Sequence, residues 1–533
     1  MSTLQKHYEN LDNWIEAKMA LSDTPGTVIA FTDRETDLQI STYGYKNIET
    51  QSPIQADTLF EIGSIGKTFT AIAILQAMEK ELLDIYDPVT KYLPWFKVQS
   101  EFSPFNLYHL LTHTSGLVRG TDFSPDARII VWRLRDTQTG FPPGERYYYS
   151  DIGYKILGLV LQRVYEKPYA EIIRDNILEP IGMQNTFAVI SHSIYEQLAR
   201  GSQYLFDDRP PHSSNPLIPA AWLETDSGDG SIASTAADMT CFIRMILNRG
   251  QGVISEESFD LMTTPASQRI YGRWGQYGCG ILTHEEDGAV FIGHTGDMPG
   301  FEAYFKADMT HGYGMMVMTT QPYPTGLIWG VLDAFKASYL NLEIALLPLP
   351  PDPLLIPNAN EYVGVYQADQ REMTIKAIGP NLFLIMDGQE IQLEQYDEDC
   401  FYIPQEEFNR YLLEFQRDQA GQVAEAFYGC EQFFHTKYGS KKSYSFPDEW
   451  NSYTGHYRSY NPWESNCRIM VRRDKLFLVW PDGFAEELTQ VAENKFRIGA
   501  LWSPEHLKFS DFSDRKALCV NLTNCEFYRF FTD

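Results

Sequence analysis

A short polar stretch that leads directly into an apolar run places the strongest constraint on how this chain folds. Residues 61–70 read Glu-Ile-Gly-Ser-Ile-Gly-Lys-Thr-Phe-Thr, and residues 71–75 are Ala-Ile-Ala-Ile-Leu. Such a run predicts a helix that is buried on all sides, which requires a sizeable core around it. Ser64 and Lys67 are three residues apart, so their side chains would leave the same face of this helix and meet.

The pairing of Ser64 with Lys67 suggests nucleophilic catalysis. A serine hydroxyl is a poor nucleophile until a base takes its proton, and a lysine becomes a base only when burial or nearby charge lowers its pKa. The apolar run behind Lys67 supplies burial, so we expect a lowered pKa there. The spacing alone is weak evidence, because Ser513 and Lys516 share it in a polar, charged context.

Two further polar motifs and one histidine stand out along the chain. Tyr149-Ser150-Asp151 precedes a predicted helix, where the phenol either packs or relays a proton if a cation holds it near ionisation; the residues alone favour neither. His294-Thr295-Gly296 ends a predicted strand. His113 lies between an apolar helix end and a Ser-Gly turn, and we expect a structural hydrogen-bonding role for it rather than a catalytic one.

A stiff, proline-rich linker at residues 346–357 divides the chain. The first domain, residues 1–345, has the pattern of a helix, a hairpin, the buried helix, further helices and then strands joined by short turns, which predicts an antiparallel sheet. The expected elements include a helix at 4–20, a hairpin at 27–31 and 38–45, strands between 277 and 318, and a closing helix at about 326–340.

Beyond the linker the sequence repeats itself. Each copy alternates apolar and polar residues in short strands with turn residues between them, as small antiparallel barrels do. We therefore expect two similar β-barrel domains in tandem, at residues 358–440 and 447–533. The corresponding segments are 361–366 and 452–457, 381–385 and 475–479, and 432–434 and 526–528.

Composition excludes several classes of partner. The chain has 533 residues, of which 44% are hydrophobic and 14% aromatic, enough for packed cores in two to four domains. The formal net charge of −28 repels nucleic acid and anionic membranes, so we expect neither as a partner. The chain has no apolar leader and no membrane-spanning run, and its seven scattered cysteines suit a reducing compartment, so we expect a cytoplasmic protein.

Together, Ser64-x-x-Lys67, Tyr149-Ser150-Asp151 and His294-Thr295-Gly296 resemble, in this order, the three active-site motifs of the penicillin-recognising serine hydrolases. Their surroundings are similar to the branch that contains class C β-lactamases, D-aminopeptidases and esterases. The two β domains that follow resemble those of three-domain D-aminopeptidases. The resemblance implies an α/β sandwich, a central antiparallel sheet with helices on both sides, followed by two lipocalin-like barrels.

The resemblance also implies catalytic roles. Ser64 would be the nucleophile and Lys67 its cationic partner. Tyr149 would act as the general base in acylation and then donate a proton to the leaving group. The backbone N–H groups of Ser64 and Asp297 would form an oxyanion hole, and His294 would flank the pocket on the edge strand. The resemblance implies no metal and no organic cofactor.

Two of the implied substrate-binding residues depart from the family pattern. His294 stands where β-lactamases have a lysine, and a neutral imidazole lacks the permanent charge that would hold a substrate carboxylate. Asp151 stands where asparagine is usual, so it keeps an acceptor and loses the amide donor. Efficient β-lactam hydrolysis and carboxypeptidase action are therefore disfavoured. The implied substrate-binding residues are Asp151, His294, Thr295, Gly296 and Asp297.

Three hypotheses follow for the function. The first is a serine hydrolase that cleaves amides or peptides with a preference for a D-amino acid at the N-terminal side, where Asp151, Asp226 and Asp297 could meet a substrate ammonium. The second is a carboxylesterase or a penicillin-binding, weakly β-lactamase-like protein on the same scaffold. The third is a silent binding module. The expected partner is a small-molecule or peptide substrate, and assembly into a homo-oligomer is left open.

Overall fold

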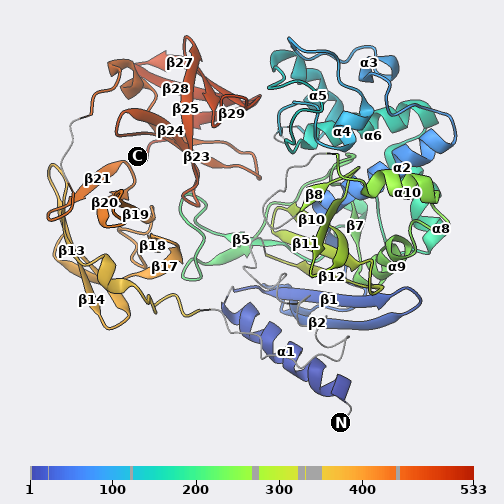
Figure 1. Ribbon diagram of the computed structural model, residues 1–533, viewed down its shortest axis with the longest axis horizontal. Coiled ribbons are helices and arrows are strands. Elements are labelled where there is room, and N and C mark those ends of the chain that lie inside the picture. Colours follow the sequence, from blue (N-terminus) through green and yellow to red (C-terminus); the bar gives the residue numbers. More distant parts are fainter. Residues whose placement is uncertain are drawn as a thin grey trace. The chain divides into compact units, whose positions relative to one another are not determined.

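The computed structural model describes residues 3–21, 23–120, 124–266, 275–321, 331, 351–439 and 444–532 (Figure 1). The chain divides into two compact units. Unit 1 comprises Met1–Gln203, Leu217–Leu349 and Trp502–Pro504, and unit 2 comprises Tyr204–Pro216, Pro350–Leu501 and Glu505–Asp533. Apart from residue 331, the helix expected at 326–340 lies outside the described residues, as does the start of the expected linker. The domain limits expected from the sequence stay predictions.

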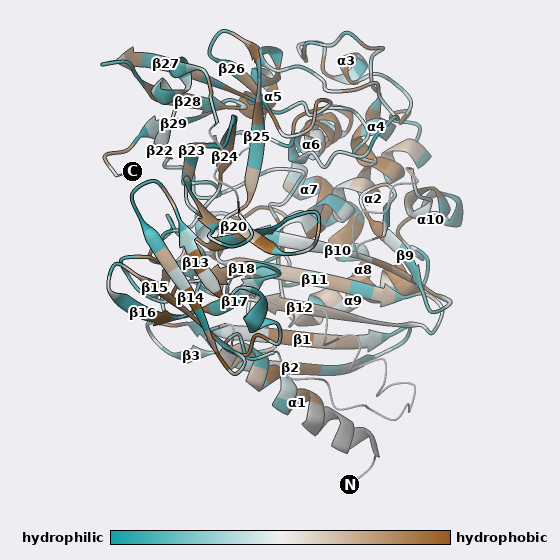
Figure 2. Ribbon diagram, turned by 60° about the vertical axis from the view of Figure 1, so that its left-hand side comes forward, coloured by the Kyte–Doolittle hydropathy of each residue, from teal (hydrophilic) through white to brown (hydrophobic). Residues whose placement is uncertain are grey.

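Unit 1 is built on an antiparallel sheet that has eight strands in the described part of the chain. These strands are β1 (Gly26–Asp33), β2 (Asp37–Asn47), β3 (Ser52–Pro53), β8 (Gln276–Tyr277), β9 (Leu282–Glu286), β10 (Ala289–Met298), β11 (Phe301–Asp308) and β12 (Tyr313–Thr319). Their order is β3-β2-β1-β12-β11-β10-β9-β8, and Figure 2 shows β11, β12, β1 and β2 side by side. The N-terminal hairpin is thus joined to the last of these strands, as Ile29 opposite Val317 illustrates.

Helices cover both faces of this sheet. On one face, α1 (Thr3–Leu21) buries Trp14 and Ile15 in a cluster with side chains of β1, β11 and β12, including Tyr304. On the other face, Phe242 of α9 (Ala236–Leu247) meets the ring of Phe305, the strand residue after Tyr304. Because successive strand residues point to opposite faces, Tyr304 and Phe305 mark the two packed layers of the expected α/β sandwich.

The helix expected after Ser64 is present and buried. A short 3₁₀ turn, η1 (Gly63–Ile65), leads into α2 (Gly66–Glu79), whose residues from Gly66 to Ala77 are all buried. Phe69 of this helix stacks on Phe242 with ring centroids 4.2 Å apart, so Phe242 of α9 contacts both α2 and the sheet. The same arrangement encloses the apolar run on every side, which explains why it carries no polar face.

A second helix, α6 (Asp151–Tyr165), packs against α2. Its start follows from local sequence, because the side chain of Ser150 caps it by accepting a hydrogen bond from the N–H of Gly153. The remaining helices and turns of unit 1 are α3 (Val89–Tyr92), α4 (Leu107–Leu111), α5 (Ala127–Arg133), η2 (Leu134–Asp136), α7 (Tyr169–Ile173), η3 (Arg174–Leu178), α8 (Glu179–Ile181), η4 (His192–Ile194) and α10 (Glu256–Thr263). Four short strands are β4 (Phe60–Glu61), β5 (Ser202–Tyr204), β6 (Leu217–Pro219) and β7 (Ala233–Ser234).

Unit 2 contains two antiparallel β structures. Within the described residues, strands β13 to β21 form a nine-stranded sheet and strands β22 to β29 a closed barrel. The first set comprises β13 (Gly364–Gln367), β14 (Glu372–Ile378), β15 (Asn381–Met386), β16 (Gln389–Gln392), β17 (Glu394–Asp397), β18 (Cys400–Tyr402), β19 (Leu413–Arg417), β20 (Val423–Tyr428) and β21 (Glu431–His435). The barrel comprises β22 (Gly455–Arg458), β23 (Asn466–Arg472), β24 (Lys475–Val479), β25 (Ala485–Ala492), β26 (Lys495–Ile498), β27 (His506–Ser513), β28 (Lys516–Leu522) and β29 (Cys525–Arg529). A 3₁₀ turn precedes each, η6 (Ala359–Glu361) and η7 (Asp448–Ser452).

The expected tandem of barrel-like domains is confirmed, with one difference. The first sheet runs β16-β15-β14-β13-β21-β20-β19-β18-β17, so β16 and β17 end it and the barrel is nearly closed rather than closed. Equivalent strands share one detail of packing. Tyr366 donates its hydroxyl to the carbonyl of Tyr362 at 2.8 Å, and Tyr457 donates to the carbonyl of Tyr453 at 2.7 Å. The sequence repeat therefore corresponds to a structural repeat.

The second Ser-x-x-Lys pair has an unrelated structure. Ser513 and Lys516 face each other across the hairpin of β27 and β28, and the two residues between them, Asp514 and Arg515, have positive φ angles of 49° and 62°. Two such residues in succession form a tight hairpin turn, not a helix. The same three-residue spacing therefore gives a side-chain contact at a helix start for Ser64 and Lys67, and a hairpin turn for Ser513 and Lys516.

None of the helices in the described ranges is long and apolar enough to cross a membrane.

Candidate active site

Ser64 and Lys67 meet as their spacing predicts. Ser64 lies in the 3₁₀ turn η1, and Lys67 is the second residue of α2. The Lys67 side chain is fully buried, and its Nζ donates to Oγ of Ser64 at 2.9 Å and to the backbone carbonyl of Asp229 at 3.0 Å. A buried ammonium is thus held directly against the serine hydroxyl.

The end of β10 packs against the turn that carries Ser64. Gly63 has a φ of +49°, and a Cβ there would lie 2.4 Å from the carbonyl oxygen of Asp297. A Cβ on Gly296 would lie 1.9 Å from the carbonyl oxygen of Ile62 and 3.1 Å from the backbone nitrogen of Ser64. Only glycine fits such close backbone approaches. The backbones of Ser64 and Asp297, expected to form an oxyanion hole, therefore lie next to each other.

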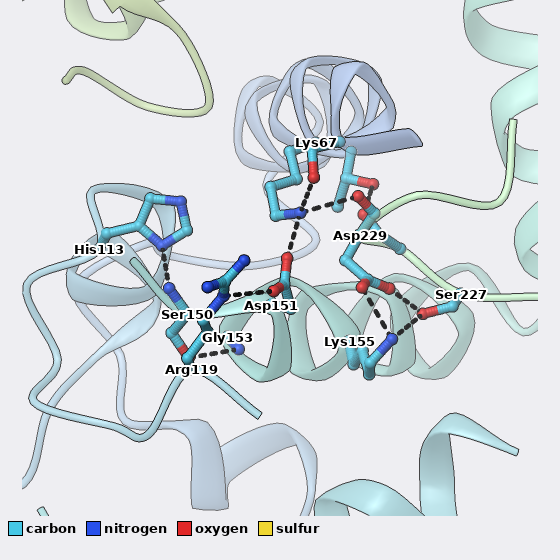
Figure 3. A network of polar contacts seen from close by, with 12 residues as sticks. Lys67, His113, Arg119, Ser150, Asp151, Gly153, Lys155, Ser227 and Asp229 are labelled. Atoms are coloured by element: carbon cyan, nitrogen blue, oxygen red, sulfur yellow. Dashed lines mark hydrogen bonds and ion pairs between the residues drawn. The ribbon is translucent and has the colours of Figure 1, made fainter. Parts of the chain in front are cut away.

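Asp151 completes the surroundings of Lys67 (Figure 3). Its Oδ1 lies 2.6 Å from Nζ of Lys67, and its Oδ2 lies 3.9 Å from Nε of Arg119. The Asp151 side chain is 23% exposed, whereas the side chain of Lys67 has no exposure. Asp151 begins α6, so the helix start determines where its carboxylate points. The carboxylate is therefore an ion-pair partner of the buried lysine at the edge of the site.

This ion pair reverses the pKa expected for Lys67. Burial is the largest single effect on Lys67 and acts to lower its pKa, but Asp151, Tyr149 and Asp229 together outweigh burial and raise the pKa above its ordinary value. Burial likewise acts to raise the pKa of Asp151, yet the charges of Lys67 and Arg119 hold it below its ordinary value. The expectation of a lowered lysine pKa was wrong, because the sequence did not indicate how close Asp151 lies. Both groups are ionised at neutral pH.

Tyr149 joins the same group of side chains. Its hydroxyl interacts with the side chains of Ser64 and Lys67, and Nζ of Lys67 lies 5.0 Å from the centre of its ring. Burial raises the pKa of Tyr149 to about 12, although the charge of Lys67 acts in the opposite direction. The phenol is therefore protonated at neutral pH. The sequence left open whether Tyr149 packs or relays a proton as a phenol held near ionisation. The raised pKa shows that the phenol is not near ionisation in the resting site.

His113 supports this tyrosine from behind. Its side chain is buried, its ring centroid lies 4.3 Å from that of Tyr149, and its Nδ1 accepts a hydrogen bond from the backbone N–H of Ser150 at 3.0 Å. Burial holds the pKa of His113 well below its ordinary value, so the ring is neutral. These contacts agree with the structural hydrogen-bonding role expected from the sequence.

His294 is also buried and neutral. Its Nδ1 lies 2.6 Å from the carbonyl oxygen of Thr295, and its Nε2 lies 2.8 Å from the hydroxyl of Tyr277. Burial lowers the pKa of His294 to about 4. With Nδ1 donating to the carbonyl, Nε2 accepts from the tyrosine hydroxyl, so both ring nitrogens have partners within the protein. A neutral ring engaged in this way adds no positive charge for a substrate carboxylate.

The strand that carries His294 is an edge only in part. In the described sheet, β9 pairs with β10 as far as Gly293, and β11 pairs with it from Phe291 to Met298. The His294–Asp297 segment therefore has a strand neighbour on one side, which leaves its other side beside the turn that carries Ser64. Thr295 and Gly296 lie in this segment, next to the nucleophile candidate.

Three further residues bear on the site: Asp226, which the sequence analysis named, and Asp229 and Lys155, which it did not. Asp226 forms a backbone bridge with Asp126 and feels the charges of Arg128 and Asp126, and its expected role toward a substrate ammonium stays a prediction. Asp229 and Lys155 were missed by the sequence analysis. A signal for each existed, because Asp229 stands between two glycines and Lys155 interrupts an apolar helix face.

A segment from far along the chain also belongs to unit 1. The ring of Trp502 lies 5.9 Å from the rings of Phe141 and of Tyr148, and the guanidinium of Arg146 lies 5.6 Å from it. Trp502 thus packs on the loop that ends in Tyr149. No group of three or more His, Cys, Asp or Glu side chains in the described ranges is arranged to hold a metal ion.

Comparison with known proteins identifies the family of this chain. Residues 11–328 match the family model described as Beta-lactamase, and the chain belongs to this family. Penicillin-binding protein 4* of Bacillus subtilis (strain 168) is 26% identical over 353 residues, which cover 62% of this chain and 75% of that protein. The resemblance inferred from the three motifs is therefore confirmed at the level of the family.

Solved structures share the fold. The octameric penicillin-binding protein homologue from Pyrococcus abyssi matches with a TM-score of 0.59 and 22% identity, covering 80% of this chain and 99% of that one. D-amino acid amidase from Ochrobactrum anthropi SV3, complexed with L-phenylalanine, matches with a TM-score of 0.52 and 21% identity, covering 62% of this chain and 99% of that one. At such identities the likeness concerns the fold alone.

Proposed function

We propose that this protein is a serine hydrolase that cleaves amide or peptide bonds through an acyl-enzyme on Ser64. The observation that carries the proposal is the contact of the Ser64 hydroxyl with the buried ammonium of Lys67, beside the hydroxyl of Tyr149. An ammonium at this place stabilises negative charge on the serine oxygen as it attacks a carbonyl. Membership of the β-lactamase family supports the same reaction class.

In the proposed acylation step, Oγ of Ser64 bonds to the carbonyl carbon, and its proton passes to the oxygen of Tyr149 while the phenol releases the proton that it already carries. Tyr149 gives its own proton to the leaving nitrogen as the bond from carbon to nitrogen breaks, so the phenol is regenerated. A pKa of about 12 is compatible with this exchange, because no phenolate needs to accumulate. Deacylation reverses the path, with water in the place of the leaving group.

The developing negative charge on the carbonyl oxygen needs donors. We assign this role to the backbone N–H groups of Ser64 and Asp297, and the close approach of β10 to the turn at Gly63 supports the assignment. Lys67 remains an ammonium throughout, because its pKa is raised by Asp151. The proton transfer therefore falls to Tyr149, with Lys67 acting through its charge.

The charges around the site favour a substrate with an amino group over one with a carboxylate. Asp151, which pairs with Lys67 and lies beside Arg119, and Asp297, whose pKa is raised by burial, place two carboxyl groups near Ser64, and the neutral His294 supplies no counter-charge for a substrate carboxylate. The preferred substrates of this proposal are amides of D-amino acids with a free amino group. The fold shared with D-amino acid amidase makes this class a reasonable first choice to test.

A substrate comparison tests the proposal. Hydrolysis of D-alanine p-nitroanilide is expected to exceed that of the L-isomer, and Ser64→Ala is expected to abolish both. Equal turnover of the two isomers, or none, would overturn the preference for D-amino acids. Activity that survives in Ser64→Ala would overturn the mechanism itself.

A carboxylesterase is the second candidate, because the high pKa of Tyr149 limits amide cleavage more than ester cleavage. An ester leaves as an alcohol or phenol and needs less protonation than an amine. Short acyl p-nitrophenyl esters turned over far faster than every amide would favour this candidate. Failure of a fluorophosphonate probe to label Ser64 would favour the silent binding module instead.

Self-association is a further part of the proposal. The homologue from Pyrococcus abyssi that shares the fold is described as octameric, which supports testing this chain for assembly. Light scattering coupled to size exclusion would measure the mass directly. A mass of one chain at micromolar concentration would contradict it. The cytoplasmic location expected from the sequence stays a prediction.

A further inference from the structure

A second buried ion pair lies directly behind the first. Nζ of Lys155 is 2.7 Å from Oδ2 of Asp229, and the two side chains are only 3% and 9% exposed. Oγ of Ser227 lies 3.2 Å from the same ammonium and donates to the other carboxylate oxygen of Asp229. Figure 3 shows Asp151 and Lys155 projecting from one helix, four residues apart in the sequence, toward Lys67 and Asp229. Each of the two helix residues thus forms an ion pair with a residue of another segment.

The two ion pairs are connected through one residue. The side chain of Asp229 is held by Lys155, and the backbone carbonyl of Asp229 accepts a hydrogen bond from Nζ of Lys67 at 3.0 Å. The neighbouring carbonyl, of Gly228, accepts a hydrogen bond from the hydroxyl of Thr70, one turn further along α2. The segment around Asp229 is therefore fixed to both helices that form the site.

The carbonyl of Asp229 is one of the groups that hold the ammonium of Lys67. An ammonium has three N–H donors, and Ser64 Oγ, Asp151 Oδ1 and the Asp229 carbonyl lie within hydrogen-bonding distance of it, with the hydroxyl of Tyr149 as a further neighbour. Since the Lys67 side chain has no exposure, no solvent can replace a lost acceptor without rearrangement. A shift of the Asp229 carbonyl would thus turn the ammonium away from the serine hydroxyl.

Stability alone does not account for the Lys155–Asp229 pair. Removing two charges from water costs several kcal/mol per ion, and buried ion pairs are commonly replaceable by apolar residues at no loss of stability. The positive charge of Lys155 also acts on Asp151, whose pKa it helps to lower. Both effects of the pair, on geometry and on charge, converge on the surroundings of Lys67.

We propose that Lys155 is a positioning residue which, through its ion pair with Asp229, fixes the carbonyl that holds Lys67 against Ser64. Lys155 touches no substrate in this role. The proposal rests on the proposed function only for the reactivity of Ser64, and it is independent of which amide or ester is cleaved. Its test therefore uses the rate of acylation and not the turnover of a chosen substrate.

The test compares the rate at which a fluorophosphonate probe acylates Ser64 in several variants. Lys155→Met is expected to slow labelling by about tenfold or more, because small displacements of catalytic groups have effects of this size. The labelling rate of this variant is also expected to begin to fall at a higher pH as the solution is made acidic. Loss of the Lys155 charge raises the pKa of Asp151, so Asp151 is protonated at a higher pH. Lys155→Arg, which keeps the charge, should restore part of the rate.

A control and a second variant make every outcome decisive. Lys167 forms an exposed ion pair with Asp175 at 2.9 Å, and Lys167→Met should label at the wild-type rate. If Lys155→Met does not fold, the double variant Lys155→Met with Asp229→Asn removes both charges and should fold while still labelling slowly. The inference would be overturned if a folded variant without Lys155 labelled at the wild-type rate and with the wild-type dependence on acid pH. An unlabelled wild type would instead overturn the proposed function.

Discussion

The Nζ of Lys67 lies 2.6 Å from Oδ1 of Asp151, and this ion pair determines the charge of the whole site. It keeps a completely buried lysine protonated, where burial alone would favour the neutral amine. The carboxylate of Asp151, which stands where asparagine is usual, thus acts as the ion-pair partner of Lys67. In the proposed mechanism protons therefore move through Tyr149, whose hydroxyl interacts with both Ser64 and Lys67.

Asp151→Asn should lower the pKa of Lys67, because burial persists while the largest charge opposing it is lost. Labelling of Ser64 by the fluorophosphonate probe is then expected to show a basic limb that the wild type lacks. Breaking a buried ion pair on one side costs about 3–5 kcal/mol, so chemical denaturation should report lower stability. Asp136→Asn, in an exposed pair with Arg133, should change neither. An unchanged pH profile would contradict the assigned charge state.

Tyr149→Phe should retain the fold and lose most of the activity. The ring that packs on His113 is kept, whereas the hydroxyl that we propose exchanges protons is removed. We expect a loss of roughly 10²–10⁴-fold in kcat, the range of general acid–base catalysis. Amides should lose more than esters of the same acyl group, because an amine must be protonated as it leaves. Equal losses on both would speak against proton donation by Tyr149.

Glu61→Gln should remove a pH dependence of stability. The Glu61 side chain in β4 is 4% exposed, and burial raises its pKa to about 8 from an ordinary value of 4.5. Because the folded pKa is the higher one, the stabilising contribution is present below pH 4.5 and is lost as pH rises through 8. Unfolding free energies between pH 5 and 9 should therefore fall more steeply for the wild type, on the order of a few kcal/mol. If the unfolding free energies of the two proteins changed with pH in parallel, the side chain of Glu61 would not be a buried, protonated carboxyl group.

His294→Gln should remove a dependence of the opposite sign. Burial lowers the pKa of His294 to about 4 from an ordinary value of 6.5, so folding favours the neutral ring. The stabilising contribution is present above pH 6.5 and is lost as pH falls through 4. Acid unfolding followed by circular dichroism should show a shallower slope for the variant. His192→Gln, on an exposed residue, serves as the control, and a slope equal to the wild type in both would contradict the assignment.

Much of the fold could be predicted from local patterns. The buried helix after Ser64, the hairpin of β1 and β2 and the cap of α6 at Ser150 follow from residue periodicity and capping chemistry, which act over a few residues. The tandem β structures followed from a repeat in the sequence. Closure did not, because whether β16 meets β17 depends on strand tilt and register over a whole sheet.

The candidate site divides in the same way. The sequence by itself determined the contact of Lys67 with Ser64, since helix geometry alone brings side chains three residues apart together. Only the tertiary structure decided the charge of Lys67, because Asp151 and Asp229 reach it from segments more than 80 residues away. Electrostatic interactions depend on distances in space, and the spacing of Ser64 and Lys67 in the sequence does not indicate how far Lys67 lies from Asp151 or Asp229. The same reason explains why the sequence did not indicate Lys155.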